Sequence, residues 1–102
     1  MIEKNDKHRG KGTKVTFSIP REWLDRPVSL VGEFNDWDRE ANPMRKRGGN
    51  WTTSVVLEPG RRYRFRYVDS WDRWHDDPAA DDLVPNGEGT FDCIVDLSES
   101  DD

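Results

Sequence analysis

The chain has 102 residues, which allows one domain with one modest core, and its lone cysteine, Cys93, excludes a disulfide within the chain. Five Trp, four Phe and two Tyr argue against a disordered chain, because disordered sequences are poor in aromatic residues. The net charge is −5, and the stretch from Asp69 onward holds twelve acidic residues against one basic residue, so we expect neither nucleic acid nor an anionic membrane as a partner.

Both ends of the chain lack apolar periodicity. Residues 1–12 are charged and contain glycine, and we expect them to form a disordered basic arm. They include no apolar core of a signal peptide, which together with the single cysteine favours a cytoplasmic location. Residues 98–102 read as an acidic tail, which leaves residues 13–97 as the folded domain.

Between these ends, apolar residues recur with a period of two, which is typical of half-buried strands. The pattern covers five runs, at residues 15–19, 28–32, 51–57, 63–67 and 91–97. Gly48-Gly49 predicts a hairpin between residues 44–47 and 50–58, and Pro59-Gly60 predicts a tight corner. Only residues 21–25 could form a helical turn, since Pro27 follows. About seven short strands joined by turns indicate an all-β sandwich or barrel.

The first candidate site is the turn Phe34-Asn35-Asp36-Trp37-Asp38 that follows the second run. Asn and Asp favour turns because their side chains bond to nearby backbone groups. Trp37 either folds back as a lid over the edge of the sheets or is presented to a ligand. We count Asn35 and Trp37 among the binding candidates.

The second candidate is the cluster around Trp71 and Trp74, in the sequence Trp-Asp-Arg-Trp-His-Asp-Asp-Pro. Two tryptophans within four residues, flanked by charges, cannot both enter the core, and exposed aromatic rings beside polar groups mark binding surfaces. An indole ring covers the C–H face of a sugar, while carboxylates, amides and guanidinium groups bond its hydroxyls. The cluster therefore points to a sugar ligand.

Polar residues on two predicted strands share the face opposite the core. Arg64 and Arg66 alternate with core residues of the fourth run, and Thr90 and Asp92 alternate with Phe91 and Cys93. Any one of them alone is more simply a solvated surface residue. All four side chains are expected to point away from the core, however, and this fits a binding face.

The sequence offers little for catalysis, and we expect neither an enzyme nor a cofactor. His75 lies among contiguous aspartates and lacks the spaced ligands of a metal site. A pair of carboxylates for glycoside hydrolysis would need a cleft, for which a two-layer domain of this size leaves little room. Cys93 is expected to be a small core residue rather than a nucleophile.

The succession of these motifs resembles family 48 carbohydrate-binding modules, the isoamylase N-terminal or early-set domains. The likeness starts with Leu30–Trp37, continues through Leu57–Gly60 and Tyr63–Asp69, and ends with Trp74–Pro78 and Gly89-Thr90. The glycogen-binding domain of the AMP-activated protein kinase β subunit belongs to the same family. The resemblance is strongest to short stand-alone bacterial forms. It implies an immunoglobulin-like antiparallel β-sandwich and an α-1,4-glucan ligand.

The resemblance also assigns roles to individual residues. Trp37 and Trp74 match the two stacking tryptophans, Arg66 matches a basic residue that bonds sugar hydroxyls, and Thr90 and Asp92 match a Thr and an Asn. The segment 70–73 is longer than in the kinase subunit, so Trp71 competes with Trp74 for the stacking role, and Arg64 competes with Arg66. In addition, Asp92 replaces an amide, and Glu88 stands where the kinase subunit has an apolar residue.

Two functions from different classes follow from these residues. The first is non-catalytic binding of glycogen, starch or maltooligosaccharide, with a glycogen-metabolising enzyme or a kinase as a candidate protein partner. The alternative is a protein-interaction domain of the same fold that does not bind sugar, with the acidic strip from Asp72 to Asp82 as its contact surface.

Overall fold

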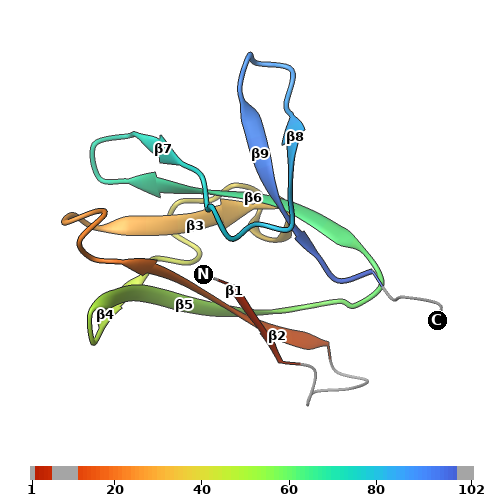
Figure 1. The fold of residues 1–102 in the computed structure, drawn as a ribbon, viewed down its shortest axis with the longest axis horizontal. Helices are drawn as coiled ribbons and strands as arrows, with labels where there is room; N and C mark the ends of the chain where they lie inside the picture. Colours follow the sequence, from red (N-terminus) through yellow and green to blue (C-terminus); the bar gives the residue numbers. More distant parts are fainter. Residues whose placement is uncertain (1, 6–11, 99–102) are drawn as a thin grey trace.

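The computed structural model describes residues 2–5 and 12–98, and in this part of the chain two antiparallel β-sheets pack into a sandwich (Figure 1). The first sheet has the order β1-β2-β5-β4, and the second has the order β3-β6-β9-β8 with β7 paired to β6. The bounds of the first sheet are β1 (Ile2–Asn5), β2 (Thr13–Pro20), β4 (Arg45–Arg47) and β5 (Asn50–Leu57). Those of the second are β3 (Val28–Gly32), β6 (Arg62–Asp69), β7 (Trp74–His75), β8 (Asp82–Pro85) and β9 (Phe91–Asp96).

The antiparallel sandwich predicted from the sequence is therefore confirmed, with nine described strands instead of about seven. Strands of two to four residues account for the difference, because β1, β7 and β8 are too short to give a clear alternation. Residues 21–25, the segment that could have formed a helical turn, contain only non-helical turns at residues 21–23. Among the described residues the only helix is the short 3-10 helix η1 (Glu33–Asn35), so none is long and apolar enough to cross a membrane.

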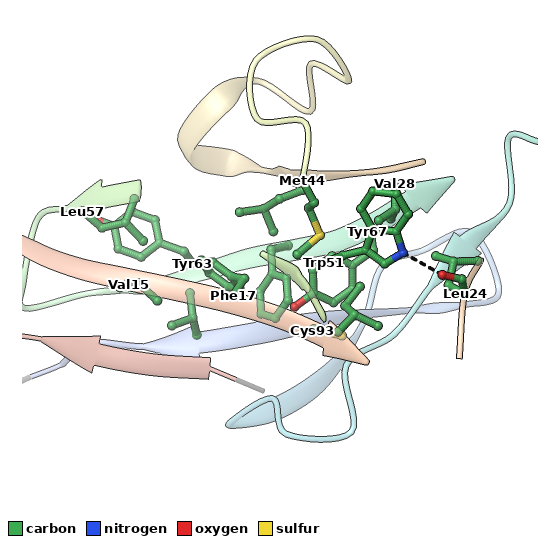
Figure 2. Close-up of a cluster of buried hydrophobic side chains, with 14 of the residues drawn as sticks. Val15, Phe17, Leu24, Val28, Met44, Trp51, Leu57, Tyr63, Tyr67 and Cys93 are labelled. Carbon is green, nitrogen blue, oxygen red and sulfur yellow. Dashed lines mark hydrogen bonds between the residues drawn. The ribbon is translucent and has the colours of Figure 1, made fainter. Parts of the chain in front are cut away.

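The core lies between the sheets and combines aliphatic side chains with five aromatic ones (Figure 2). The rings of Phe17 from β2 and Phe65 from β6 meet edge to face, with centroids 5.0 Å apart, and both side chains are fully buried. Trp51 is buried on β5, and its indole Nε1 donates a hydrogen bond of 2.6 Å to the carbonyl oxygen of Leu24. This bond gives the buried indole N–H a partner and ties the loop between β2 and β3 to the core.

The N-terminal segment corrects one expectation. Residues 2–5 were expected to belong to a disordered arm, but they form β1, which pairs with β2 in the register Ile2↔Phe17 to Asn5↔Lys14. Ile2 packs against the core, and Lys4 Nζ lies 2.7 Å from Asp81 Oδ2. A single apolar residue gives no period, which is why the sequence did not reveal the strand. Residues 1 and 6–11 of the expected arm, and residues 99–102 of the expected tail, lie outside the described residues.

The β8–β9 hairpin corrects a second expectation. Phe91 is two residues from the core residue Cys93 on β9 and therefore points to the same face, yet it is 49% exposed. Leu83 on β8 is also 49% exposed. Figure 1 shows the hairpin extending away from β2 and β5 at its tip. The inward face of the hairpin is therefore uncovered there, because the first sheet does not reach it.

Candidate functional site

The outer face of the second sheet carries an open hollow of about 730 Å³. It lies between the β6–β7 hairpin, the η1 turn and the β8–β9 hairpin. Five residues that line it are candidates from the sequence, namely Trp37, Arg66, Trp74, Thr90 and Asp92. Asn86 and Glu88 complete the lining. The candidates Asn35, Trp71 and Arg64 do not line it.

Trp37 is held in the hollow by a turn with two consecutive left-handed residues. Asp36 and Trp37 have φ angles of 56° and 59°, which cost conformational energy in residues other than glycine. The turn is closed by a hydrogen bond of 2.9 Å from the Trp37 N–H to the carbonyl oxygen of Gly32. The Trp37 side chain is half-buried, so it is neither a closed lid over the core nor a freely exposed ring.

Asn35 stabilises this turn from within. Its Oδ1 accepts a hydrogen bond of 3.0 Å from the Gly32 N–H, and its Nδ2 donates to the carbonyl oxygen of Leu30 at 3.0 Å and to Oδ1 of Asn42 at 2.8 Å. The amide is thus used by the protein itself. The geometry gives Asn35 a scaffolding position behind Trp37 rather than a place on the surface of the hollow.

Trp74 lies on β7, directly opposite Val68 on β6. Its ring is 39% exposed, and its centroid lies 6.5 Å from that of Trp37 with 49° between the two planes. The guanidinium carbons of Arg66 and Arg39 lie 5.6 and 5.7 Å from the Trp74 centroid, within the range of cation–π contacts. The two indoles therefore form one continuous, bent aromatic surface.

Trp71 lies outside this aromatic surface, although it is only three positions before Trp74 in the sequence. It is 63% exposed at the β6–β7 turn, where the Arg26 guanidinium stacks on its ring at 3.6 Å from the centroid. Its position separates it from Trp74, so the structure brings Trp74 and not Trp71 together with Trp37.

The turn that presents Trp74 is organised by a buried carboxylate that the sequence analysis did not single out. The Asp69 side chain is fully buried, and its Oδ1 accepts hydrogen bonds from the backbone N–H groups of Trp71 at 2.8 Å and Arg73 at 3.1 Å. Its Oδ2 lies 2.8 Å from Nε2 of His75 and 3.3 Å from Nη1 of Arg26. Burial by itself raises the pKa of this carboxyl, but the hydrogen bonds from His75 and the two backbone groups outweigh it and lower the pKa to about 2.

The polar part of the hollow is pre-ordered by ion pairs and an amide. Arg66 Nε donates to Asp76 Oδ1 at 3.1 Å, and Arg64 Nη1 donates to Asp92 Oδ2 at 3.3 Å. Arg64 thus acts on the hollow indirectly, by holding Asp92 and the carbonyl oxygen of Pro85. Asp92 does lie on the outer face as expected, but it is buried because Arg64 and its other partner, Asn86, cover it.

Asn86 is a further residue that the sequence analysis missed. Its Nδ2 donates to Thr90 Oγ1 at 2.7 Å and to Asp92 Oδ1 at 3.2 Å, while its Oδ1 accepts from the Glu88 N–H at 3.0 Å. One amide therefore fixes both polar candidates of β8–β9. In the sequence, an Asn-Gly pair such as Asn86-Gly87 indicates a turn and nothing more, which is why its role in the site was not predicted.

Other reactive groups are removed from the hollow. Cys93 is fully buried in the core, and burial raises the pKa of its thiol to about 11, which suppresses the nucleophilic thiolate. His75 is engaged by Asp69. The described residues contain no cluster of three or more His, Cys, Asp or Glu side chains that could hold a metal ion.

A bent aromatic surface with ordered polar groups beside it is an arrangement suited to sugars, whose C–H faces stack on aromatic rings and whose hydroxyls bond to polar groups. Residues 8–80 match the profile of carbohydrate-binding module 48, the isoamylase N-terminal domain. The match covers well over half of the chain, and the chain belongs to this family.

The chain is also similar to parts of much longer proteins. It is 50% identical over 48 residues to a 1,4-alpha-glucan branching enzyme of Rhizobium johnstonii, a match that covers 44% of this chain and 6% of that protein. It is 29% identical over 85 residues to a 1,4-alpha-glucan branching enzyme of Cutibacterium acnes, covering 78% of this chain and 13% of that protein. A 1,4-alpha-glucan-branching enzyme of Rhizophagus irregularis is 47% identical over 45 residues, which cover 41% of this chain and 7% of that protein. The chain thus spans only a small fraction of the relatives it matches.

Proposed function

We propose that the chain binds α-1,4-glucan without transforming it, and that the bent surface of Trp37 and Trp74 carries the binding. The centroid separation of 6.5 Å is that of two rings in mutual contact, so a sugar cannot be clamped between them. Instead, successive sugars stack on two facets inclined by 49°. An α-1,4-linked chain curves, whereas a β-1,4-linked chain is flat and suits coplanar rings. This inclination is the observation that favours an α-glucan.

The expected affinity is weak. Covering ~100 Å² of apolar surface on each ring contributes about 2.5 kcal/mol, and two such contacts must offset an association cost of several kcal/mol. The dissociation constant should therefore lie roughly between micromolar and millimolar. Arg66 and Thr90 add hydrogen bonds that select the orientation of the chain, and Asp92 supports them by holding Asn86, the partner of Thr90.

The absence of a catalytic role belongs to the same proposal. The carboxylates of Asp76 and Asp92 beside the hollow are each paired with an arginine of β6. A glycosidase needs two carboxyl groups free to act on the substrate, one as an acid and one as a base or nucleophile. The module would instead bring a glucan-processing enzyme to its polymer, either within one chain or as a separate partner such as a glycogen-metabolising enzyme or a kinase. The proposed location is the cytoplasm, where an unpaired thiol such as Cys93 stays reduced.

A titration monitored at the tryptophan indole N–H signals by NMR tests this function. Maltoheptaose should shift the Trp37 and Trp74 signals in the micromolar to millimolar range, and cellohexaose should shift neither. The Trp23 signal is an internal control, since that ring is 58% exposed but lies outside the hollow. No shift at millimolar maltoheptaose would refute glucan binding.

A protein-interaction function is the second candidate, and the uncovered face of the β8–β9 hairpin favours it. Leu83 is paired with Cys93 and Pro85 with Phe91, so Leu83, Pro85 and Phe91 share one face, and the two large side chains are each 49% exposed. Exposed apolar groups that gather on one face favour protein contacts. A partner whose binding is lost in Phe91→Ser and is insensitive to added glycogen would support this function, while an unchanged complex would exclude this face.

A further inference from the structure

A second hollow of about 260 Å³ lies on the outer face of the same sheet. Six of the residues around it matter for its chemistry, namely Ser29, Arg39, Pro43, Met44, Val68 and Ser70. It shares no lining residue with the hollow around Trp37 and Trp74. Neither the sequence motifs nor the family resemblance drew attention to it.

The strand register places the two hollows side by side. Ser29 on β3 is opposite Val68 on β6, and Val68 is in turn opposite Trp74 on β7. Directly opposed residues of antiparallel strands project to the same face, so these three form one row across the sheet. Trp74 borders the first hollow, while Val68 and Ser29 border the second.

Arg39 stands at the border between them. It lines the second hollow, and its guanidinium carbon lies 5.7 Å from the centroid of the Trp74 ring in the first. Its ion pair with Asp72 joins two side chains that are 49% and 68% exposed. Such a pair is screened by water and salt and is readily exchanged for another partner, so the guanidinium is available to a ligand that crosses the border.

The lining of the second hollow suits a sugar. Pro43 is exposed and provides apolar surface for the C–H groups of a pyranose, whereas Met44 and Val68 are almost fully buried. Ser29 and Ser70 also line the hollow, and a serine hydroxyl can both donate a hydrogen bond to the rim of a sugar and accept one from it. The volume is slightly below the roughly 300–1,000 Å³ of pockets for drug-sized ligands, so it fits a short piece of an oligosaccharide.

We propose that this second hollow binds the sugar residues of a glucan that continue beyond those stacked on Trp37 and Trp74, with Arg39 bonding the chain where it crosses. The inference rests on the proposed glucan binding and extends it from one aromatic surface to a longer footprint. It predicts that long oligosaccharides gain contacts that short ones do not make.

The backbone N–H signal of Ser29 provides a direct reporter, because Ser29 lines the second hollow and is not fully buried. In ¹⁵N-labelled protein, maltotriose should shift the Trp37 and Trp74 indole signals and leave the Ser29 signal in place. Maltodecaose should shift all three. A Ser29 signal that does not move with maltodecaose would overturn the proposal.

Affinity ratios give the second test, and ratios cancel any general loss of stability. Arg39→Ala removes the donor, Ser29→Leu fills the hollow, and Arg47→Ala is the control because Arg47 is an exposed arginine on the opposite sheet. The ratio of maltodecaose to maltotriose affinity should fall about 3- to 10-fold in the first two variants, as expected for one lost hydrogen bond or more, and stay unchanged in the control. A longer sugar chain offers more positions at which it can bind, but this statistical advantage is the same for every variant and cancels when variants are compared.

The outcomes separate this inference from the proposed function. Trp signals that respond to both sugars, together with an unchanged affinity ratio in Arg39→Ala and Ser29→Leu, would overturn the second hollow and keep glucan binding. Trp signals that respond to neither sugar would overturn both.

Discussion

Replacing Asp69 with Asn removes the buried charge that closes the β6–β7 turn and keeps the size of the side chain. In the native protein the carboxylate accepts two backbone hydrogen bonds at Oδ1 and faces His75 and Arg26 at Oδ2. An amide can accept fewer of these bonds, and it leaves the Arg26 guanidinium without a charged partner inside the fold. We therefore expect a less stable domain and a less well-fixed Trp74.

The lowered pKa of Asp69 sets the size of the effect. A fall from 3.8 to about 2 corresponds to about 2 kcal/mol of stability at neutral pH. For a domain of this size that is roughly 10 °C in the midpoint of thermal unfolding. Because the folded-state pKa is below the unfolded one, this stability is fully present above about pH 4 and is lost as the pH falls toward 2.

Urea unfolding at pH 7 and at pH 2 measures this difference directly. Asp69→Asn should be less stable than the native protein at pH 7 and close to it at pH 2. Asp82 and Asp96 also have lowered pKa values, but they are present in both proteins and cancel in the comparison. The matched control is Asp25→Asn, because Asp25 also contacts Arg26, at 3.7 Å, but is 89% exposed and should matter little. Equal stability of Asp69→Asn and the native protein at pH 7 would refute the reasoning.

Three further predictions concern other parts of the molecule. Gly32→Ala should prevent stable folding, because the added Cβ would lie 2.5 Å from the Arg64 carbonyl oxygen and 2.9 Å from the Phe34 ring. Circular dichroism measures this, and a native-like spectrum would contradict the close packing of this turn. Cys93 should react with a thiol reagent at pH 8 only after unfolding in urea, since its thiol is buried with a pKa of about 11, and fast labelling of the folded protein would show that the site opens. Trp71→Ala should bind maltotriose with an affinity within about two-fold of the native protein in a fluorescence titration, because a single exposed ring outside the hollow contributes little; a larger loss would return Trp71 to the site.

The long strands and their turns could be predicted from the sequence. Alternation along β2, β5 and β6 is strong because each has one face on the hydrophobic core. Gly48, with a φ of 59°, lies in the hairpin turn that the Gly48-Gly49 pair predicted. The turn that contains Trp37 could also be predicted, since its Asn and Asp residues favour turns. These features are local, which is why a single sequence reveals them.

Features that depend on distant contacts could not be predicted. The alternation along β9 placed Phe91 on the face that points to the core. That pattern gives the face of a strand, but it does not show how far the opposing sheet extends. Asp69 and Asn86 resemble ordinary turn residues in the sequence, and their importance comes from partners brought together by folding. The choice between Trp71 and Trp74 likewise depended on how the β6–β7 turn closes around Asp69.

Calorimetric titration with maltoheptaose tests the central claim, that Trp37 and Trp74 together form a glucan-binding surface. Trp37→Ala and Trp74→Ala should each weaken binding by at least about ten-fold, because each loses roughly 2.5 kcal/mol of contact with a sugar face. Trp23→Ala, which removes an equally large exposed ring outside the hollow, should bind as the native protein does. Native affinity in both Trp37→Ala and Trp74→Ala would contradict the account.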